Sequence, residues 1–179
     1  TVTSTDGSGS TFAQSFSVSI NDVNEAPTNI TLSAAAINEN DSGAVVGTLG
    51  SSDEDAGDTV TYSLSGTHGS YFEVVNGQLK LKDGTSANYE ANWTLNVTVT
   101  ATDSGGLTAN QNFSISVADV NDVPTAIQLS TNSLQSGETG ATVGTLTTSD
   151  EDSGESFSYS VNDQRFEIVN GLLKLKAEQ

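Results

Sequence analysis

The sequence repeats itself with a period of 97 residues, and this repeat limits the chain to an array of similar modules. Residues 1–64 align with residues 98–161 without a gap, and 32 of the 64 aligned pairs are identical. After a three-residue deletion, the alignment continues and pairs Phe72–Lys82 with Phe166–Lys176. A long segment that reappears in register within one chain is typical of tandem repeat proteins.

The two prolines of the chain, Pro27 and Pro124, occupy equivalent positions in the repeat and mark module starts. This predicts a C-terminal module fragment at 1–26, one complete module at 27–123 and the N-terminal part of a further module at 124–179. The first region supplies the last strands of a module, and the third supplies the first strands. Residues 1–26 of the same or another chain can therefore complete the third region, which predicts head-to-tail self-association through complementary half modules.

Short runs of alternating apolar and polar residues predict strands with one buried face. Leu95, Val97, Val99 and Ala101 form the clearest run. Clusters of Gly, Asn, Asp and Ser separate the runs, and the Asn-Gly pair at 76–77 is typical of a tight hairpin turn. No helical period is present. About seven short strands in a module of ~97 residues predict an all-β, Greek-key, immunoglobulin-like β-sandwich of two antiparallel sheets.

The charge balance excludes several classes of function. Asp and Glu number 23 against 5 Lys and Arg, which gives a net charge of -18 and leaves no basic surface for nucleic acid. There is no cysteine for disulfide or thiolate chemistry. No stretch approaches the roughly 18 apolar residues that a membrane span requires, and no signal peptide is recognisable. Cations are the expected partners.

The acidic residues gather in predicted turns and module junctions. Asp53, Asp55 and Asp103 recur in other copies as the residues Asp150, Asp152 and Asp6. Like charges about 5 Å apart repel by roughly 3 kcal/mol at an effective dielectric constant near 20, so such a cluster requires a counter-ion. Carboxylate and amide oxygens without cysteine favour Ca²⁺. An EF-hand loop is excluded, because a loop that begins at Asp53 has Leu64 at the twelfth position in place of glutamate.

Five motifs in a fixed order resemble cadherin repeats, in the cadherin-like form found in very large bacterial surface proteins. They are Glu39-Asn40, Asp53-Glu54-Asp55, Asn88-Tyr89-Glu90, Ala101-Thr102-Asp103 and the linker from Asp119 to Pro124. The resemblance covers the entire chain and implies a cadherin-like sandwich whose linkers bind calcium.

The resemblance also implies a set of ligands at each junction. Near residue 122 the implied ligands are Glu39, Asn88, Glu90, Asp119, Asn121 and Asp122 from the complete module and Asp150 and Asp152 from the next. Near residue 25 they are Asp22, Asn24, Glu25, Asp53, Asp55 and Asp103. Extracellular calcium modules commonly have dissociation constants of about 10⁻⁴–10⁻³ M.

Calcium at these linkers would turn a flexible array into a rod. The sequence therefore predicts a rigidified stalk or spacer segment of a secreted or cell-surface protein of the bacterial adhesin type. The expected location is extracellular or at the cell surface. Its expected partners are calcium, the neighbouring repeats, and a receptor that is either a cell-surface molecule or a polysaccharide.

Two other classes of function are alternatives to the stalk. A carbohydrate-binding module would use exposed aromatic residues, and Trp93 and Tyr89 are the candidates. Trp93 alternates in phase with Leu95 and Val97, which predicts a side chain in the core, whereas Tyr89 is expected to pack at the junction. An enzyme with a Ser-His-Asp triad would need His68, the only histidine. His68 lies in a loop that the other copy lacks and is expected to be solvated, so no catalytic activity is predicted.

Overall fold

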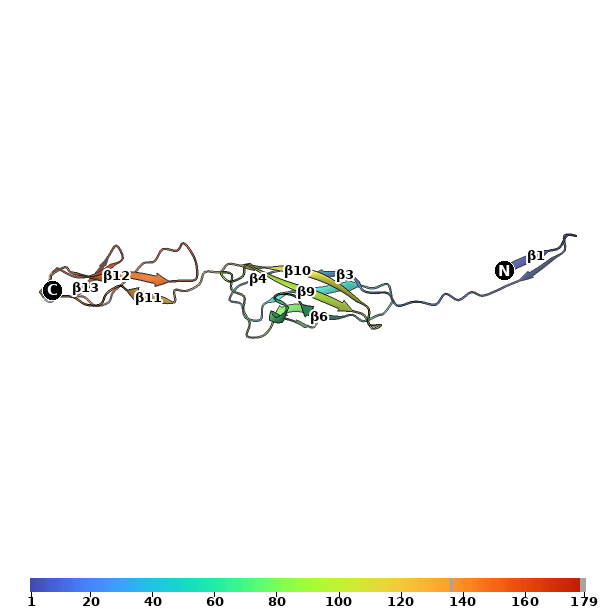
Figure 1. Cartoon of the computed structure of the whole chain (residues 1–179), viewed down its shortest axis with the longest axis horizontal. Coiled ribbons are helices and arrows are strands. Elements are labelled where there is room, and N and C mark those ends of the chain that lie inside the picture. The colour runs from blue at the N-terminus through green and yellow to red at the C-terminus, as the bar shows by residue number, and fades with distance from the viewer. Residues whose placement is uncertain (136, 178–179) are drawn as a thin grey trace.

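The computed structural model describes residues 1–135 and 137–177. Ser136, which aligns with Glu39, and the last two residues of the predicted region 124–179 lie outside the described residues. The chain forms a hairpin, a two-sheet module and a single further sheet, which lie in a line with the two termini at opposite ends (Figure 1). No described helix is long and apolar enough to cross a membrane.

The complete module, within residues 27–123, is a β-sandwich of two four-stranded sheets. One sheet contains, in spatial order, β3 (Thr28–Leu32), β5 (Val45–Ser52), β8 (Gln78–Leu81) and β7 (Phe72–Val75). The other contains β4 (Ala36–Asn38), β10 (Thr108–Ala118), β9 (Thr94–Thr102) and β6 (Thr61–Ser65). A single 3-10 turn, Gly69–Tyr71, precedes β7.

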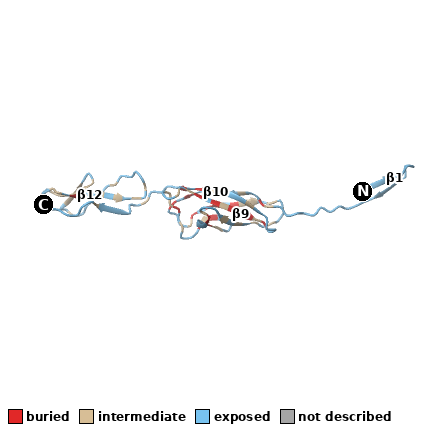
Figure 2. Cartoon of the chain, viewed as in Figure 1, coloured by how far each residue is buried: buried red, intermediate tan, exposed pale blue. Residues whose placement is uncertain are grey.

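The hydrophobic core lies between these two sheets, and the buried residues are concentrated in the complete module (Figure 2). The alternating run predicted from Leu95 to Ala101 becomes β9, and its apolar side chains are at most 1% exposed. Leu79 and Leu81 face them from β8 and are fully buried. The predicted all-β sandwich is thus confirmed, because a period of two places every second side chain in the core.

Two details of the sandwich differ from the prediction. The module has eight strands rather than about seven, because the chain adds a short edge strand, β4. β4 also pairs in parallel with β10, whereas all pairs were expected to be antiparallel. After β3 the chain crosses from one sheet to the edge of the other, and at that edge it runs in the same direction as β10.

The predicted hairpin turn at residues 76–77 joins β7 and β8. Asn76 has a φ of 52° and Gly77 has a φ of 76°. Both residues adopt the left-handed conformation that a two-residue turn of this type requires, and Asn and Gly tolerate it best. The equivalent residues in the other copy, Asn170 and Gly171, have φ values of 52° and 75°.

The strands outside the complete module reproduce parts of it. The hairpin of β1 (Val2–Thr5) and β2 (Thr11–Gln14) aligns with segments of β9 and β10. The C-terminal sheet contains, in spatial order, β11 (Ala126–Leu129), β12 (Thr142–Ser149), β14 (Leu172–Leu175) and β13 (Phe166–Val169), which align with β3, β5, β8 and β7.

The counterparts of β4 and β6 form no strands among the described residues of the C-terminal region. In the complete module those two strands flank β10 and β9. The C-terminal region contains no counterpart of β9 or β10 in its described residues, so these segments have no sheet to join. The second sheet of the sandwich therefore depends on the β9–β10 pair.

Candidate metal centres at the module junctions

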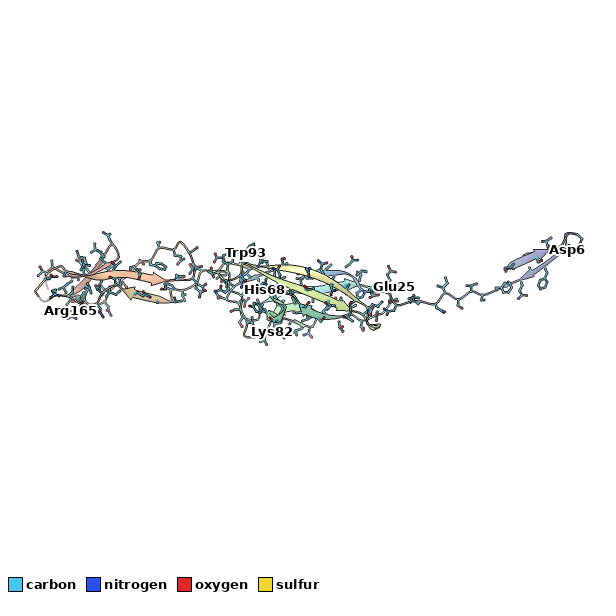
Figure 3. All side chains as sticks on the ribbon, in the orientation of Figure 1. Asp6, Glu25, His68, Lys82, Trp93 and Arg165 are labelled. Atoms are coloured by element: carbon cyan, nitrogen blue, oxygen red, sulfur yellow. The ribbon has the colours of Figure 1, made fainter. Side chains whose placement is uncertain are left out.

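Acidic side chains gather at both ends of the complete module. The first junction comprises linker residues 22–26 and the loops 53–58 and 103–105. The second junction comprises linker residues 119–123, Glu39 and the loops 88–91 and 150–155. Figure 3 labels Glu25 at the first junction, at the end of the complete module nearer the N-terminal hairpin.

The second junction is organised around Glu39, which directly follows β4 and is only 2% exposed. The Tyr89 backbone N–H donates to its Oε2 at 2.7 Å, and the Val120 backbone N–H donates to its Oε1 at 2.8 Å. One buried carboxylate therefore holds the 88–91 loop and the linker together. The parallel pairing of β4 with β10 brings Glu39 beside the linker, because both lie just beyond neighbouring strand ends.

Two groups of carboxylates meet at this junction. One oxygen each from Glu39, Glu90 and Asp122 lies within 4.8 Å of the other two, and the same holds for Glu90, Asp119 and Asp152. Two oxygens bound to one Ca²⁺ at about 2.4 Å can be at most ~4.8 Å apart, so both groups fit the span of one ion. Asp152 belongs to the following module, and its Oδ2 accepts a 2.6 Å hydrogen bond from the Asp122 backbone N–H.

The loop 150–155 provides a further group, in which Asp150, Asp152 and Glu155 bring oxygens within 4.8 Å of one another. Glu155 was not among the predicted ligands. At the first junction the equivalent residues Asp53, Asp55 and Asp58 form the same grouping, and Asp58 was also missed. An acid five residues after the first Asp of both copies is the sequence signal that could have identified them.

The predicted ligands Asn88 and Asn121 lie outside the acidic groups and make hydrogen bonds of their own. The Asn88 Nδ2 donates to Glu151 Oε2 of the following module at 2.6 Å, and its Oδ1 accepts from the Ala91 backbone N–H. The Asn121 Nδ2 donates to the Asp122 carbonyl oxygen. Asn88 thus bridges the two modules directly through Glu151, a residue that was not among the predicted ligands.

At the first junction, Asp22, Glu25 and Asp55 bring one oxygen each within 4.8 Å. The Glu25 backbone N–H donates to Asp55 Oδ2 at 2.9 Å, as Asp122 does to Asp152 at the second junction. Asp22, Asn24, Asp55 and Asp58 also line an open hollow of about 300 Å³.

Asn24 and Asp103 are joined to each other at this junction, because the Asn24 Nδ2 donates to Asp103 Oδ2 at 2.9 Å. Asp103 is 6% exposed, and its Oδ1 accepts from the Leu107 backbone N–H, which stabilises the β9–β10 turn. Asp6 makes the equivalent bond to the Ser10 backbone N–H in the N-terminal hairpin. Asp103 therefore has a structural role in the turn as well as a position at the junction.

Three buried carboxylate oxygens at the junctions have no hydrogen-bond partner among the described residues. They are Asp53 Oδ2 at the first junction and Asp122 Oδ2 and Asp150 Oδ2 at the second. The salt bridges of the described chain lie elsewhere, and their cations are Lys80 and Arg165. A buried and unpaired carboxylate oxygen is costly, so these atoms fit a bound cation.

The pKa values of two linker carboxylates, Asp122 and Glu25, are raised, which shows that their ionised forms are disfavoured at the junctions. Burial raises the pKa of Asp122, and the nearby charges of Glu39, Glu151 and Asp152 raise it further despite the Asn40 hydrogen bond. Burial also raises the pKa of Glu25, with a further contribution from Asp55.

Glu90 and Glu39 show how hydrogen bonds and charge compete. The hydrogen bond from the backbone N–H of Glu90 to its own carboxylate favours the ionised form. Burial and the charges of Glu39, Asp119 and Asp152 outweigh this bond and raise the pKa of Glu90 overall. Burial likewise acts to raise the pKa of Glu39, but the hydrogen bonds from the Tyr89 and Val120 backbone N–H groups, together with one to the Glu90 side chain, lower the pKa overall. Glu39 is therefore held ionised, whereas its neighbours bind protons more readily than usual.

The donor set is composed of carboxylate, amide and carbonyl oxygens, which Ca²⁺ prefers. The chain contains no cysteine, and its single histidine, His68, lies in the turn after β6. The unpaired oxygens and the spacing of the acidic groups therefore fit a hard divalent cation that takes several oxygen ligands.

The expectations for Trp93 and His68 require corrections. Trp93 is 71% exposed, although its phase with Leu95 predicted a buried side chain. It lies in a bend just before β9 begins at Thr94, so the alternation of the strand does not determine its direction. Tyr89 is half-buried and packs against the core. His68 is half-buried rather than solvated, and its Nδ1 accepts a hydrogen bond from the Asn96 backbone N–H at 2.9 Å.

Comparison with solved structures gives matches to cadherin extracellular domains. Human Protocadherin-24 EC1-2 matches with 25% identity and a TM-score of 0.67, over 86% of this chain and 79% of that chain. Human CDH23 EC21-23 matches with 24% identity and a TM-score of 0.62, over 88% and 56% of the two chains. Drosophila N-cadherin EC1-4 matches with 22% identity and a TM-score of 0.59, over 86% and 41%.

No known family profile and no curated protein matches the sequence. The structural matches nevertheless cover most of the chain at low identity, and they confirm the resemblance to cadherin repeats. The chain therefore has the fold of cadherin extracellular domains arranged in tandem, and groups of acidic side chains lie at both module junctions.

Proposed function

We propose that this chain is a calcium-stiffened stalk or spacer segment of a secreted or cell-surface adhesion protein of the bacterial adhesin type. The observation that carries the proposal is the second junction, where Glu90 and Asp119 of one module and Asp152 of the next bring oxygens within 4.8 Å. An ion held by this group joins two modules that are otherwise connected by a short linker. The proposed partners are calcium and the neighbouring repeats.

The proposed boundaries follow the repeat, with modules or module parts at 1–26, 27–123 and 124–179. The proposed ligands are those implied by the cadherin resemblance, together with Asp58 and Glu155. Without calcium, the acidic groups repel one another across the linker and favour bent or mobile arrangements. Calcium that binds only the aligned arrangement stabilises it by mass action, in proportion to its concentration relative to the dissociation constant. An extracellular location, where calcium is abundant, suits this dependence.

Small-angle X-ray scattering of the chain in millimolar calcium and in EDTA tests the proposal. We expect a longer maximum dimension and a narrower distribution of distances with calcium. The variant Asp163→Asn is the control, because Asp163 pairs with Arg165 away from both junctions and should respond to calcium as the parent chain does. Equal dimensions with and without calcium would overturn the stalk proposal.

A second proposal concerns self-association of the 179-residue polypeptide. Phe16, Val18 and Ile20 are 64%, 88% and 95% exposed, and they align with Phe113, Ile115 and Val117 of β10. Ile115 and Val117 are at most 4% exposed in the complete module. The N-terminal segment thus has the apolar pattern of a strand that belongs in a sandwich.

The C-terminal sheet offers the complementary surface. Its hollow of about 300 Å³ is lined by Leu146, Tyr159 and Leu173 among others. The N-terminal hairpin lies at the opposite end of the same chain, so we propose that it completes the C-terminal region of another copy, head to tail (Figure 1).

Sedimentation velocity across a concentration series tests this association. We expect concentration-dependent oligomers that Ile20→Glu weakens, whereas Val75→Glu, at a partly exposed position of β7 in the complete module, leaves them unchanged. A parent chain that stays monomeric throughout the series would rule the association out.

A further inference from the structure

We infer that the complete module carries a binding groove for a neutral polysaccharide, which begins beside the second junction and contains none of the acidic residues of either junction. Two hollows lie along β9 and share Asn96 as a lining residue. The first has a volume of about 380 Å³ and includes Trp93 and His68, and the second has a volume of about 250 Å³ and includes Thr98 and Asn112. From Trp93 to Thr98 an extended chain advances about 16 Å, which is longer than one sugar ring.

The groove provides one aromatic surface and several polar groups, which is the combination that sugars require. Trp93 is the only tryptophan, and its 71% exposed indole offers a flat face for the C–H groups of a sugar ring. Figure 3 shows Trp93 and His68 labelled toward the same end of the complete module. Carbohydrate sites, like other small-molecule sites, need only a few well-placed polar groups around such a surface.

His68 is fixed in position at the edge of the groove. Its Nδ1 accepts from the Asn96 backbone N–H, which requires a neutral ring with the proton on Nε2. The Tyr71 ring lies 5.6 Å away between ring centroids and supports the imidazole from one side. The Nε2–H therefore remains a donor with no hydrogen-bond partner among the described residues.

The amide side chains along β9 and β10 are pre-oriented in the same way. The Asn96 Oδ1 accepts from Ser114 Oγ at 2.8 Å, and the Asn112 Oδ1 accepts from Thr98 Oγ1 at 2.7 Å. These bonds fix the amides and leave their NH₂ groups without partners among the described residues. Such groups can donate to sugar hydroxyls with little loss of side-chain freedom.

The charge of the groove selects the ligand class. The chain has a net charge of -18, yet neither hollow is lined by Asp, Glu, Lys or Arg. An anionic polysaccharide would meet a repulsive field and no cation, whereas a neutral one would meet neither penalty. Addition of a peptide strand beside Asn96 is disfavoured, because β10 pairs with β9 on one edge and His68 already bonds both the Asn96 backbone N–H and its carbonyl oxygen on the other.

The groove is also specific to the complete module. The loop 65–71, which supplies His68 and Thr67 to the hollows, is three residues shorter in the C-terminal copy. The proposal is independent of calcium, since none of the lining residues belongs to a junction's acidic groups.

Fluorescence titration tests the inference directly, because Trp93 is the only tryptophan of the chain. The soluble probes are dextran, galactomannan and xyloglucan as neutral polysaccharides, and alginate as the acidic one. We expect at least one neutral polysaccharide to change the tryptophan emission saturably in EDTA as well as in calcium. Polysaccharide binding in EDTA does not depend on calcium at the junctions, so it tests this site alone. The stalk proposal is tested separately by the scattering experiment.

Affinity electrophoresis with the same polysaccharides tests the variants. We expect Trp93→Ala to weaken retardation at least about tenfold and Asn96→Ala to weaken it severalfold. Phe12→Ala is the matched control, because it removes another exposed aromatic far from the groove. No retardation or emission change by any neutral probe, a response to alginate alone, or full binding by Trp93→Ala would each overturn the inference. Loss of polysaccharide binding in the Phe12→Ala variant would also overturn the inference.

Discussion

The two junctions differ in how many sides supply acidic groups. At the second junction, Glu39 and Glu90 face Asp122 from the body of the module, and Asp152 enters from the next module. At the first junction, Asp22, Glu25 and Asp55 come from the linker and the following loop alone. The described residues upstream of the first linker form a hairpin that contributes no acid to this group. One linker motif therefore belongs to two acidic groups that differ in where their carboxylates come from, because the surrounding modules supply the remaining acids.

The variant Glu39→Ala should have the largest effect on this comparison. It removes a buried carboxylate, a proposed calcium ligand, and leaves the N–H groups of Tyr89 and Val120 unpaired, which costs about 2–4 kcal/mol of the free energy of unfolding. Urea unfolding in EDTA, followed by the fluorescence of Trp93, measures this loss. Calcium titration calorimetry should show that the second junction no longer binds and that the first is unchanged.

Glu39→Gln is the matched control for charge. It keeps one oxygen acceptor, so we expect a smaller loss of stability with a similar loss of calcium binding. Intact calcium binding in both variants would show that Glu39 serves only to hold the linker.

The reciprocal variants Asp152→Asn and Asp55→Asn should separate the junctions. Each Asp accepts a backbone N–H from its linker, from Asp122 and Glu25 respectively, and an amide oxygen can still accept that bond. The lost charge should weaken calcium binding at the variant's own junction by about tenfold or more. Calorimetry of each variant then reports the other junction alone, and we expect Asp55→Asn to retain the tighter site. Equal affinities in the two variants would contradict the difference between the junctions.

The pH dependence should sharpen the same difference. The pKa values of Glu90 and Asp122 at the second junction and of Glu25 at the first are raised, so protons compete with calcium sooner than at ordinary carboxylates. We expect calcium affinity to fall as the pH decreases from 7 toward about 4, and to fall more steeply at the second junction. Calorimetry of the two reciprocal variants across this range measures both slopes.

Without calcium, in EDTA, the raised and the lowered pKa values change the stability of the fold in opposite directions as the pH falls. Groups with raised pKa values destabilise the folded junction when ionised, and protonation relieves this as the pH falls through those values. Glu39 has a lowered pKa, so its contribution to stability is present above its ordinary value and is lost as the pH falls through the lowered one. Urea unfolding of Glu39→Gln against pH isolates that contribution. A calcium affinity independent of pH at both junctions would argue against carboxylate ligands.

The variant Gly105→Ala should have the smallest effect and only at the first junction. An added Cβ would overlap the Asn24 side-chain amide, so the Asn24 side chain must move away from Asp103. We expect a loss of calcium affinity of about twofold to fivefold at the first junction, measured by calorimetry. Asn24→Ala is the control, since it removes the same contact without adding bulk. A change at the second junction would show that the variant acts through the whole module.

Much of this arrangement was predictable because the repeat and the alternation are local signals. The run from Leu95 to Ala101 and the turn at Asn76 gave the sandwich, and the gathering of acids in turns gave both junctions. The parallel pairing of β4 was not predictable, since it depends on where the chain lands after it crosses between sheets. Trp93 was misassigned because strand alternation was extended one residue beyond the strand start. The contact of Asn88 with Glu151 requires the relative placement of two modules, which no single module encodes.

The parallel β4–β10 pair has a mechanical consequence for a chain under tension. β3 begins just after the first linker and continues into β4, and β10 ends just before the second linker. A pull through the two linkers therefore draws β4 and β10 in opposite directions along their length. The bonds from the Ser116 N–H to the Ala35 carbonyl and from the Glu39 N–H to the Ala118 carbonyl are then loaded together in shear. Rupture must break them at once rather than one after another, so the geometry favours resistance to force.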